Sequence, residues 1–361
     1  MLLLQTRLMV LIAVLSCGAI RGQQADWTFV DATRGEREIP VDFRFPLGLD
    51  APAPLVVVGH GFAMQAGDYD DLAAGLVGEG YVVGLVATES GFAPSHEDFG
   101  LDMAYVAAHA WDEVTTVPIS ANAALMGHSM GGGAAWLGAA SWGAMVATVI
   151  GLAPAETNPS AIAAAAGLQV PALVISGSSD AVTPPEDHHE PIYEASENSP
   201  CRAFVSLIDG GHCGFADAGT VCDIGELFFN GMDRPTQQAH TLEILKLWLA
   251  AHLAGDSSAW ADLEAYAEAE GEVDWVSDCL TSSLSTGEER QPATFWPNPA
   301  HHHLQCRTTV LSAIATDVSG RSVAIPVRGS TLDVSGLSAG IYWLVAQTPN
   351  DGEVSGRLLV E

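Results

Sequence analysis

A short apolar run that ends in a serine enclosed by glycines is the feature that most restricts the fold of this chain. Residues 123–126 (Ala-Ala-Leu-Met) read as a buried strand, and Gly127-His128-Ser129-Met130-Gly131 follows at once. In the G-x-S-x-G pattern, a tight strand-to-helix turn holds the serine hydroxyl outward, and the small flanking residues let the backbone pack closely. Strained backbone of this kind requires rigid elements on both sides. The motif therefore predicts a nucleophilic Ser129 between a buried strand and a helix.

Continuous apolar runs alternate with segments of helical character over much of the chain. Runs that are apolar on both faces and alternate with helices predict a mainly parallel sheet covered on both sides, which is an α/β fold. Residues 27–30 and 39–45 flank a turn at Arg34-Gly35 and predict an N-terminal hairpin. The other expected strands are 55–58, 81–86, 123–126, 148–152, 172–175 and 203–208, and the expected helices are 70–80, 99–110, 130–141 and 237–253, the last with core residues Leu242, Leu245, Leu249 and Leu253.

Two residues that follow expected strands supply partners for the serine. Asp180 comes after the run 172–175, and His212 comes after the run 203–208. The chain order serine, acid, histidine is the order used in the nucleophile-elbow fold. A carboxylate fixes the imidazole tautomer while the imidazole takes the serine proton. We therefore predict a Ser129, Asp180, His212 triad, with Asp209 as the alternative acid.

Two backbone amides are candidates for an oxyanion hole. One belongs to Met130, directly after the nucleophile, and the other to Phe62, in the loop after the run 55–58. Gly61 permits close approach of the backbone to a substrate. We also expect the side chains of Phe62 and Met130 to form apolar walls of the substrate site.

The remaining histidines are interpreted as structural or solvent-exposed. His60 and His128 lie beside the elements that carry the chemistry, and we expect them to pack and to form local hydrogen bonds. The tracts His188-His189 and His301-His302-His303 lack cysteines or carboxylates at ligand spacing, which favours solvated loops over metal sites. We expect no metal and no cofactor.

Together these motifs resemble the α/β-hydrolases related to bacterial polyester hydrolases (cutinase-like enzymes) and chlorophyllases. The resemblance covers about residues 26–253 and implies that Ser129 is the nucleophile, Asp180 the acid and His212 the base, with Phe62 and Met130 as oxyanion donors. The motifs that carry it are His60-Gly61-Phe62 and the segments 127–132, 170–180, 183–185, 191–193 and 210–215.

One position departs from the polyester-hydrolase pattern. Those enzymes carry a tryptophan after the Ala-Pro pair that follows the next strand, whereas Ala153-Pro154 is followed here by Ala155. The departure favours a general carboxylesterase or a lipase over a hydrolase of polyesters such as PET or cutin. A secreted peptidase of the same fold and a non-catalytic surface binding protein are two further hypotheses.

The charge and the N-terminus bear on partners and location. The formal net charge is −31, and so acidic a chain repels nucleic acids and anionic membranes. Arg7, the apolar run 8–15 and the small residues up to Gly22 predict a secretory signal, too short to span a bilayer. Cleavage is expected near Gly22, with a lipoprotein site at Cys17 as the alternative.

Export makes disulfides possible. A Cys213–Cys222 pair would close a short loop beside His212, and a Cys279–Cys306 pair would tie the linker to the C-terminal domain. Pairing does not follow from the sequence, and an odd number of cysteines leaves at least one thiol free or paired with another molecule. The five cysteines after the signal are Cys201, Cys213, Cys222, Cys279 and Cys306.

The chain divides into four parts. After the signal (1–22) we expect a catalytic domain (23–255), an acidic helical extension and linker (256–291) anchored by Trp260 and Trp275, and a β-sandwich (292–361) of short alternating strands. The tail resembles a type IX secretion C-terminal sorting domain through the segments 295–300, 317–321, 337–342 and 357–360. That resemblance implies type IX secretion machinery as a partner and a secreted or surface-attached protein; an accessory Ig-like module is the alternative.

Overall fold

The computed structural model describes residues 22–142, 146–279, 303–306, 309–317, 321–338, 340–349 and 352–360. Residues 1–21 of the expected signal peptide with Cys17, residues 280–291 of the expected extension and linker, the segment 295–300 and the turn at 318–320 lie outside these residues.

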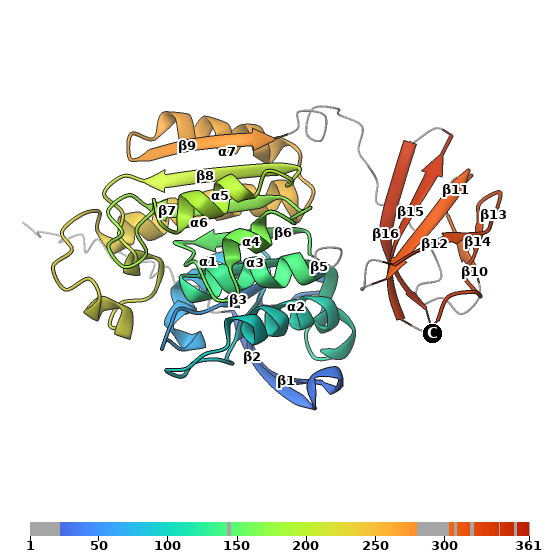
Figure 1. Cartoon of the computed structure of the whole chain (residues 1–361), viewed down its shortest axis with the longest axis horizontal. Helices are drawn as coiled ribbons and strands as arrows, with labels where there is room; N and C mark the ends of the chain where they lie inside the picture. The colour runs from blue at the N-terminus through green and yellow to red at the C-terminus, as the bar shows by residue number, and fades with distance from the viewer. Residues whose placement is uncertain are drawn as a thin grey trace, which may run out of the picture.

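A nine-stranded mixed sheet forms the centre of residues 22–279 (Figure 1). The strands β3 to β8 run parallel, and antiparallel strands close both edges, which confirms the predicted hairpin and the α/β class. In sheet order the strands are β1 (Gln23–Asp31), β2 (Arg37–Phe45), β4 (Val82–Val86), β3 (Ala53–Gly59), β5 (Ile119–His128), β6 (Thr148–Leu152), β7 (Ala172–Gly177), β8 (Cys201–Leu207) and β9 (Val273–Cys279).

Helices cover both faces of this sheet. Alternate residues of one strand enter different cores: Val57 belongs to one apolar cluster, and Val56 and Val58 belong to the other. This explains why the strands read as continuous apolar runs. One cluster receives α2 (His96–Glu113), α3 (Met130–Trp142), α4 (Ala161–Ala165) and α5 (His189–Ala195); the other receives α1 (Asp70–Gly78), α6 (Arg234–His252) and α7 (Ser258–Ala269).

The helix α6 shows how the sequence specifies an element that borders the site. Asp233 caps its first turn by accepting from the Thr236 amide at 3.1 Å. Leu245, Leu249 and Leu253 are buried as predicted, whereas Leu242 is only partly buried.

Within the described part of the expected extension, residues 256–279, only about half is helical. The helix α7 confirms part of it, and Trp260 is buried with its ring centroid 5.9 Å from that of Trp275. Residues 273–279 are instead strand β9, which pairs with β8, so the prediction of a linker is wrong there. Burial alternates along this edge strand, but the exposed positions hold Asp274, Val276 and Asp278, so the sequence shows no regular alternation of apolar and polar residues.

The candidate Cys279–Cys306 disulfide does not form. Cys279 bonds to Cys201, because the register of β8 and β9 places these two residues opposite each other. The candidate Cys213–Cys222 disulfide is present, and Cys306 is a buried free thiol in the part of the chain that the structure describes.

The C-terminal described residues form two small antiparallel sheets. Apolar side chains from both sheets, such as Leu332 and Leu344, belong to one buried cluster. The sheets are β10 (His303–Gln305), β14 (Thr331–Asp333) and β13 (Val327–Arg328), and β12 (Ser322–Ile325), β11 (Ser312–Asp317), β15 (Gly340–Thr348) and β16 (Gly352–Val360). None of the helices in the described part of the chain has the length and hydropathy of a membrane-spanning segment.

Candidate active site

Ser129 lies at the junction between β5 and α3 in a strained conformation. Its φ angle is 54°, in the left-handed region that residues other than glycine rarely adopt. The Ser129 amide donates to the Leu152 carbonyl at 2.9 Å, and the Ser129 carbonyl accepts from the Ala155 amide at 2.9 Å. Backbone bonds to β6 and to the loop after it therefore hold the serine in this conformation.

The glycines of the motif allow close contact of backbone with backbone. A Cβ atom on Gly127 would overlap the Gly131 carbonyl group, and a Cβ atom on Gly131 would overlap the backbone of Gly59. Both positions therefore require glycine for packing, whatever the reaction.

Gly127→Ala should lower the free energy of unfolding by about 3 kcal/mol, because backbone atoms on both sides must move apart. Urea denaturation followed by circular dichroism measures this loss. Gly78→Ala is the matched control, since a Cβ there meets no atom within 4 Å. Equal midpoints for the two variants would contradict the prediction.

Asp180 and His212 lie at the ends of neighbouring parallel strands and bond to each other. Asp180 Oδ2 is 2.7 Å from His212 Nδ1, and both residues are buried. Asp180 Oδ1 accepts from the amides of Val182 and Thr183, each at 2.8 Å. Burial alone raises the pKa of the Asp180 carboxyl, but the hydrogen bonds from His212 and Thr183 outweigh it, so the pKa lies below its ordinary value. An ionised Asp180 accepts a hydrogen bond from Nδ1–H and leaves Nε2 as the basic nitrogen.

His128 connects the elbow to the His212 loop. His128 Nε2 donates to the His212 carbonyl at 3.1 Å, and the two ring centroids are 4.6 Å apart. Tyr69 donates to His128 Nδ1 at 2.8 Å and accepts from the Gly61 amide at 2.9 Å. Burial holds the pKa of His128 well below its usual range. The expected structural role of His128 is thus confirmed.

Ser129 itself is not bonded to the imidazole. Among the hydrogen bonds of the described residues, none joins the Ser129 hydroxyl to His212. Catalytic hydrogen bonds in free enzymes are often long and shorten when substrate binds. In the structure Asp180 is bonded to His212, and His128, which precedes Ser129, packs against His212. The contact between the Ser129 hydroxyl and His212 stays a prediction.

The candidate oxyanion residues differ in exposure. Phe62 follows β3, is 50% exposed and meets Phe92 edge-on, with ring centroids 6.2 Å apart. Met130 begins α3 and is 3% exposed, within the apolar core. Neither amide donates to another backbone group in the described residues. The two amides are therefore available to a substrate, but the Met130 side chain mainly packs inward.

His60 also has the expected structural role. It is buried, and its ring nitrogens lie 2.8 Å from the carbonyls of Gly61 and Thr88.

His189 is a buried residue of the site, although the sequence pattern predicted a solvated loop there. His189 Nδ1 lies 2.7 Å from Ser176 Oγ, and His189 Nε2 lies 3.0 Å from Thr183 Oγ1. Thr183 Oγ1 also donates to Asp180 Oδ2 at 2.9 Å. The expectation was wrong because α5 begins at His189 and its first turn packs beneath the end of β7; His188 is only partly exposed.

Burial of His189 predicts acid sensitivity. Burial lowers its pKa to about 3 from an ordinary 6.5, so only the unfolded chain takes up this proton between those values. The contribution of His189 to the free energy of unfolding is therefore complete above pH 6.5 and is lost as the pH falls toward 3. From pH 7 to pH 4.5 the native protein should lose about 3 kcal/mol more than His189→Gln, as measured by urea unfolding at both pH values. Other buried groups, such as His252 with a pKa of about 4, contribute equally in both proteins, so their effects cancel in the difference. An equal loss of the free energy of unfolding in the native protein and in His189→Gln would contradict the role of His189.

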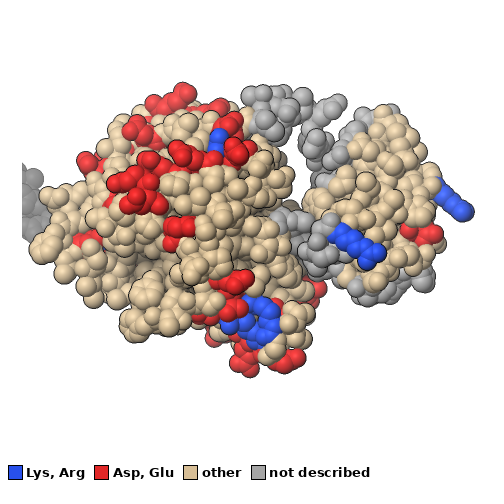
Figure 2. Space-filling view, viewed as in Figure 1, with Lys and Arg blue, Asp and Glu red and all other residues tan. Residues whose placement is uncertain are grey.

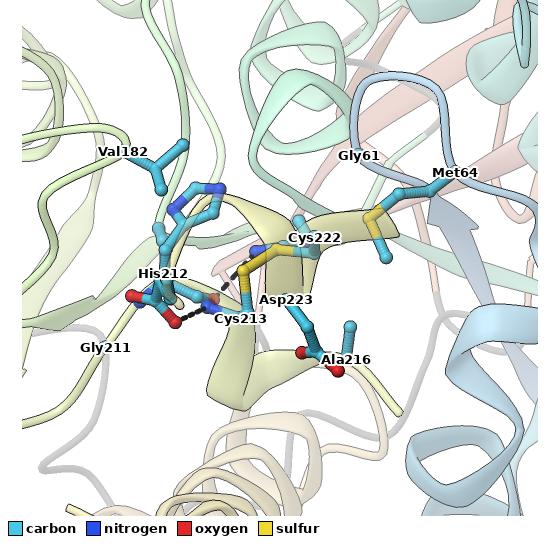
Figure 3. The surroundings of a disulfide bond; sticks show 12 residues. Gly61, Met64, Val182, Gly211, His212, Cys213, Ala216, Cys222 and Asp223 are labelled. Carbon is cyan, nitrogen blue, oxygen red and sulfur yellow. Dashed lines mark hydrogen bonds between the residues drawn. A yellow bond between two sulfur atoms is a disulfide. The ribbon is translucent and has the colours of Figure 1, made fainter. Parts of the chain in front are cut away.

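The Cys213–Cys222 disulfide borders His212, and Figure 3 shows Val182 on the other side of that histidine. Potential ligand atoms of His128, His212 and Cys222 lie within 4.8 Å of one another. However, the sulfur is bonded to Cys213 and His212 Nδ1 is bonded to Asp180, so this group does not form a metal site.

A hollow of about 950 Å³ lies behind these loops. It is lined by residues of the segments 179–181, 208–209 and 225–236, together with Glu272. None of the predicted site residues lines it. The hollow therefore borders the loops that carry Asp180 and His212 without containing the reacting groups.

Comparison with known proteins identifies the family of this chain. No curated protein matches it. A family model described as PETase, PET hydrolase-like, matches residues 45–239, a span that runs from the end of β2 into α6 and includes all five predicted site residues. Because this match covers more than half of the chain, the protein belongs to the PETase family of PET hydrolase-like proteins.

Proposed function

We propose that this protein is an exported serine hydrolase that cleaves carboxylic esters through an acyl-enzyme and needs no cofactor. The proposal rests on one observation above all, the 2.7 Å bond between buried Asp180 and His212 beside a strained Ser129. Family membership supports an ester or polyester hydrolase at the level of the reaction class.

The proposed reaction has two halves. Ser129 Oγ attacks the ester carbonyl while His212 Nε2 takes its proton, and the amides of Phe62 and Met130 stabilise the oxyanion. The imidazolium gives the proton to the departing alcohol, which leaves an acyl-serine. Water activated by His212 then releases the acid and regenerates the serine hydroxyl.

The substrate class that we favour is an apolar ester, with polyester as the specific candidate. Phe92 is 85% exposed and Phe228 is 97% exposed, on loops near the site, and Val182 is 42% exposed beside Asp180. Figure 2 shows that the left end of the first domain, toward which β8 points in Figure 1, is largely uncharged in this view. Ala155 stands where polyester hydrolases carry their aromatic clamp, so a general carboxylesterase or lipase is the second candidate.

A substrate panel with a fluorophosphonate probe tests the reaction class. The folded protein should be labelled at a serine and should hydrolyse p-nitrophenyl esters, with release of acid from solid polyester film separating the two candidates. Faster cleavage of aminoacyl anilides would indicate a peptidase. A folded protein that is not labelled would be a non-catalytic binding protein.

Export and surface attachment form a separate part of the proposal. The support is the expected signal, the resemblance of the tail to a type IX sorting domain, and two disulfides, which are compatible with an extracellular protein. The two C-terminal sheets around one core fit the proposed β-sandwich. Periplasmic retention in a host that has the type IX machinery would contradict this part.

A further inference from the structure

One carboxylate binds the two backbone amides at the start of the His212 loop. Glu226 Oε1 accepts from the His212 amide at 2.6 Å, and Glu226 Oε2 accepts from the Cys213 amide at 2.8 Å. We propose that Glu226 is a positioning residue that fixes the proposed base His212 from the loop before α6. This inference rests on the proposed function.

The neighbouring peptide groups are bound by other elements. Gln237 on α6 accepts from the Gly211 amide at 2.9 Å and donates to the Gly211 carbonyl at 2.7 Å. On the other side of the loop, His128 donates to the His212 carbonyl at 3.1 Å. Glu226 provides the contact to the amide of His212 itself. Because its bonds are charge-assisted, they are stronger than bonds between neutral groups.

The residues around the loop leave room for the Glu226 carboxylate to reach the two amides. A Cβ atom on Gly211 would lie 2.7 Å from Glu226 Oε1 and 2.8 Å from the Phe229 ring, so a larger residue there would push the carboxylate away. The segment that carries Glu226 is tied at its start by the Cys213–Cys222 disulfide and by the ion pair of Asp223 with Arg234. Gly211 and this anchored segment together place Glu226 against the amides.

The charge of Glu226 has a second consequence. A carboxylate near His212 favours the imidazolium that forms when the base takes a proton, so removal of the charge should shift the acid limb of the kcat/KM profile to lower pH. Other titratable and charged groups around the imidazole and its loop are unchanged in a Glu226 variant. They are Asp180 after β7, His189 on α5, His128 on β5 and Arg234 on α6.

Kinetics of Glu226 variants on p-nitrophenyl butyrate between pH 5 and 9 test the inference. Glu226→Ala should lower kcat about 30-fold with KM within about twofold, because the base is less well positioned. Glu226→Gln should lower kcat about 5-fold, because the glutamine side chain has one acceptor oxygen where the carboxylate has two. In both variants the acid limb should move to lower pH, a change that a general loss of folded protein would not produce.

Glu272→Gln is the matched control. Glu272 lines the same hollow, but its carboxylate contacts His240 rather than the His212 loop, so this variant should keep the native kcat and pH profile. If Glu226→Ala does not fold, the isosteric Glu226→Gln carries the test. Native kcat and an unmoved acid limb in Glu226→Gln would overturn the inference. A native protein without esterase activity or fluorophosphonate labelling would instead overturn the proposed function.

Discussion

Ser129→Ala should lower kcat for p-nitrophenyl butyrate by about 10⁵-fold, the largest effect expected of any single substitution in this chain. The change removes the oxygen that attacks the ester, and water bound near the amides of Phe62 and Met130 would support only slow residual hydrolysis. Alanine is no more strained than serine at a φ of 54°, and the bonds that hold this residue in place belong to its backbone. We therefore expect an unchanged circular dichroism spectrum and loss of fluorophosphonate labelling.

Ser141→Ala is the control for this experiment. Ser141 lies at the far end of the same helix, α3, and its exposed hydroxyl donates to the Leu137 carbonyl at 2.9 Å. Its removal should leave turnover and labelling at native levels. Turnover by purified Ser129→Ala at more than a few per cent of the native rate would exclude Ser129 as the nucleophile.

The parts of the fold that follow from local pattern were predictable from the sequence. The strand Thr148–Leu152 begins and ends where its apolar run does, because every residue in it is buried. Similarly, α3 follows directly from the glycine-flanked serine. Strand β9 was not predictable, because Asp274 and Asp278 resemble the acidic extension before it and its partner β8 lies far away in the sequence. The same long-range pairing decides that Cys279 bonds to Cys201.

The candidate site was predictable where strand ends bring residues together. Asp180 and His212 follow neighbouring parallel strands, whose carboxyl ends meet at one edge of the sheet. His189 and Glu226 were missed, because their contacts depend on the conformation of loops. The sequence pattern D-x-x-T, with Thr183 three residues after Asp180, was the one available sign of a polar network behind the acid.

Asp180→Asn should lower kcat by about 10⁴-fold near neutral pH while leaving the fold intact. The introduced asparagine can still accept from the amides of Val182 and Thr183 through its carbonyl oxygen, and it then presents its NH₂ group to His212 Nδ1. An NH₂ group donates and cannot accept, so it favours the imidazole tautomer with the proton on Nε2. That tautomer cannot take the proton of Ser129.

Asp209→Asn, a substitution of the alternative acid, is the matched control for this prediction. Asp209 has a φ angle of 57°, a conformation that asparagine tolerates well, so Asp209→Asn should fold normally. His212 Nδ1–H donates to Asp180 and not to Asp209, and Asp209→Asn should therefore keep kcat within about threefold of native. Parallel measurement of kcat for both variants between pH 6 and 9 separates the two acids. A large loss in Asp209→Asn with near-native turnover in Asp180→Asn would require the imidazole to turn toward Asp209 during catalysis and would overturn the role proposed for Asp180.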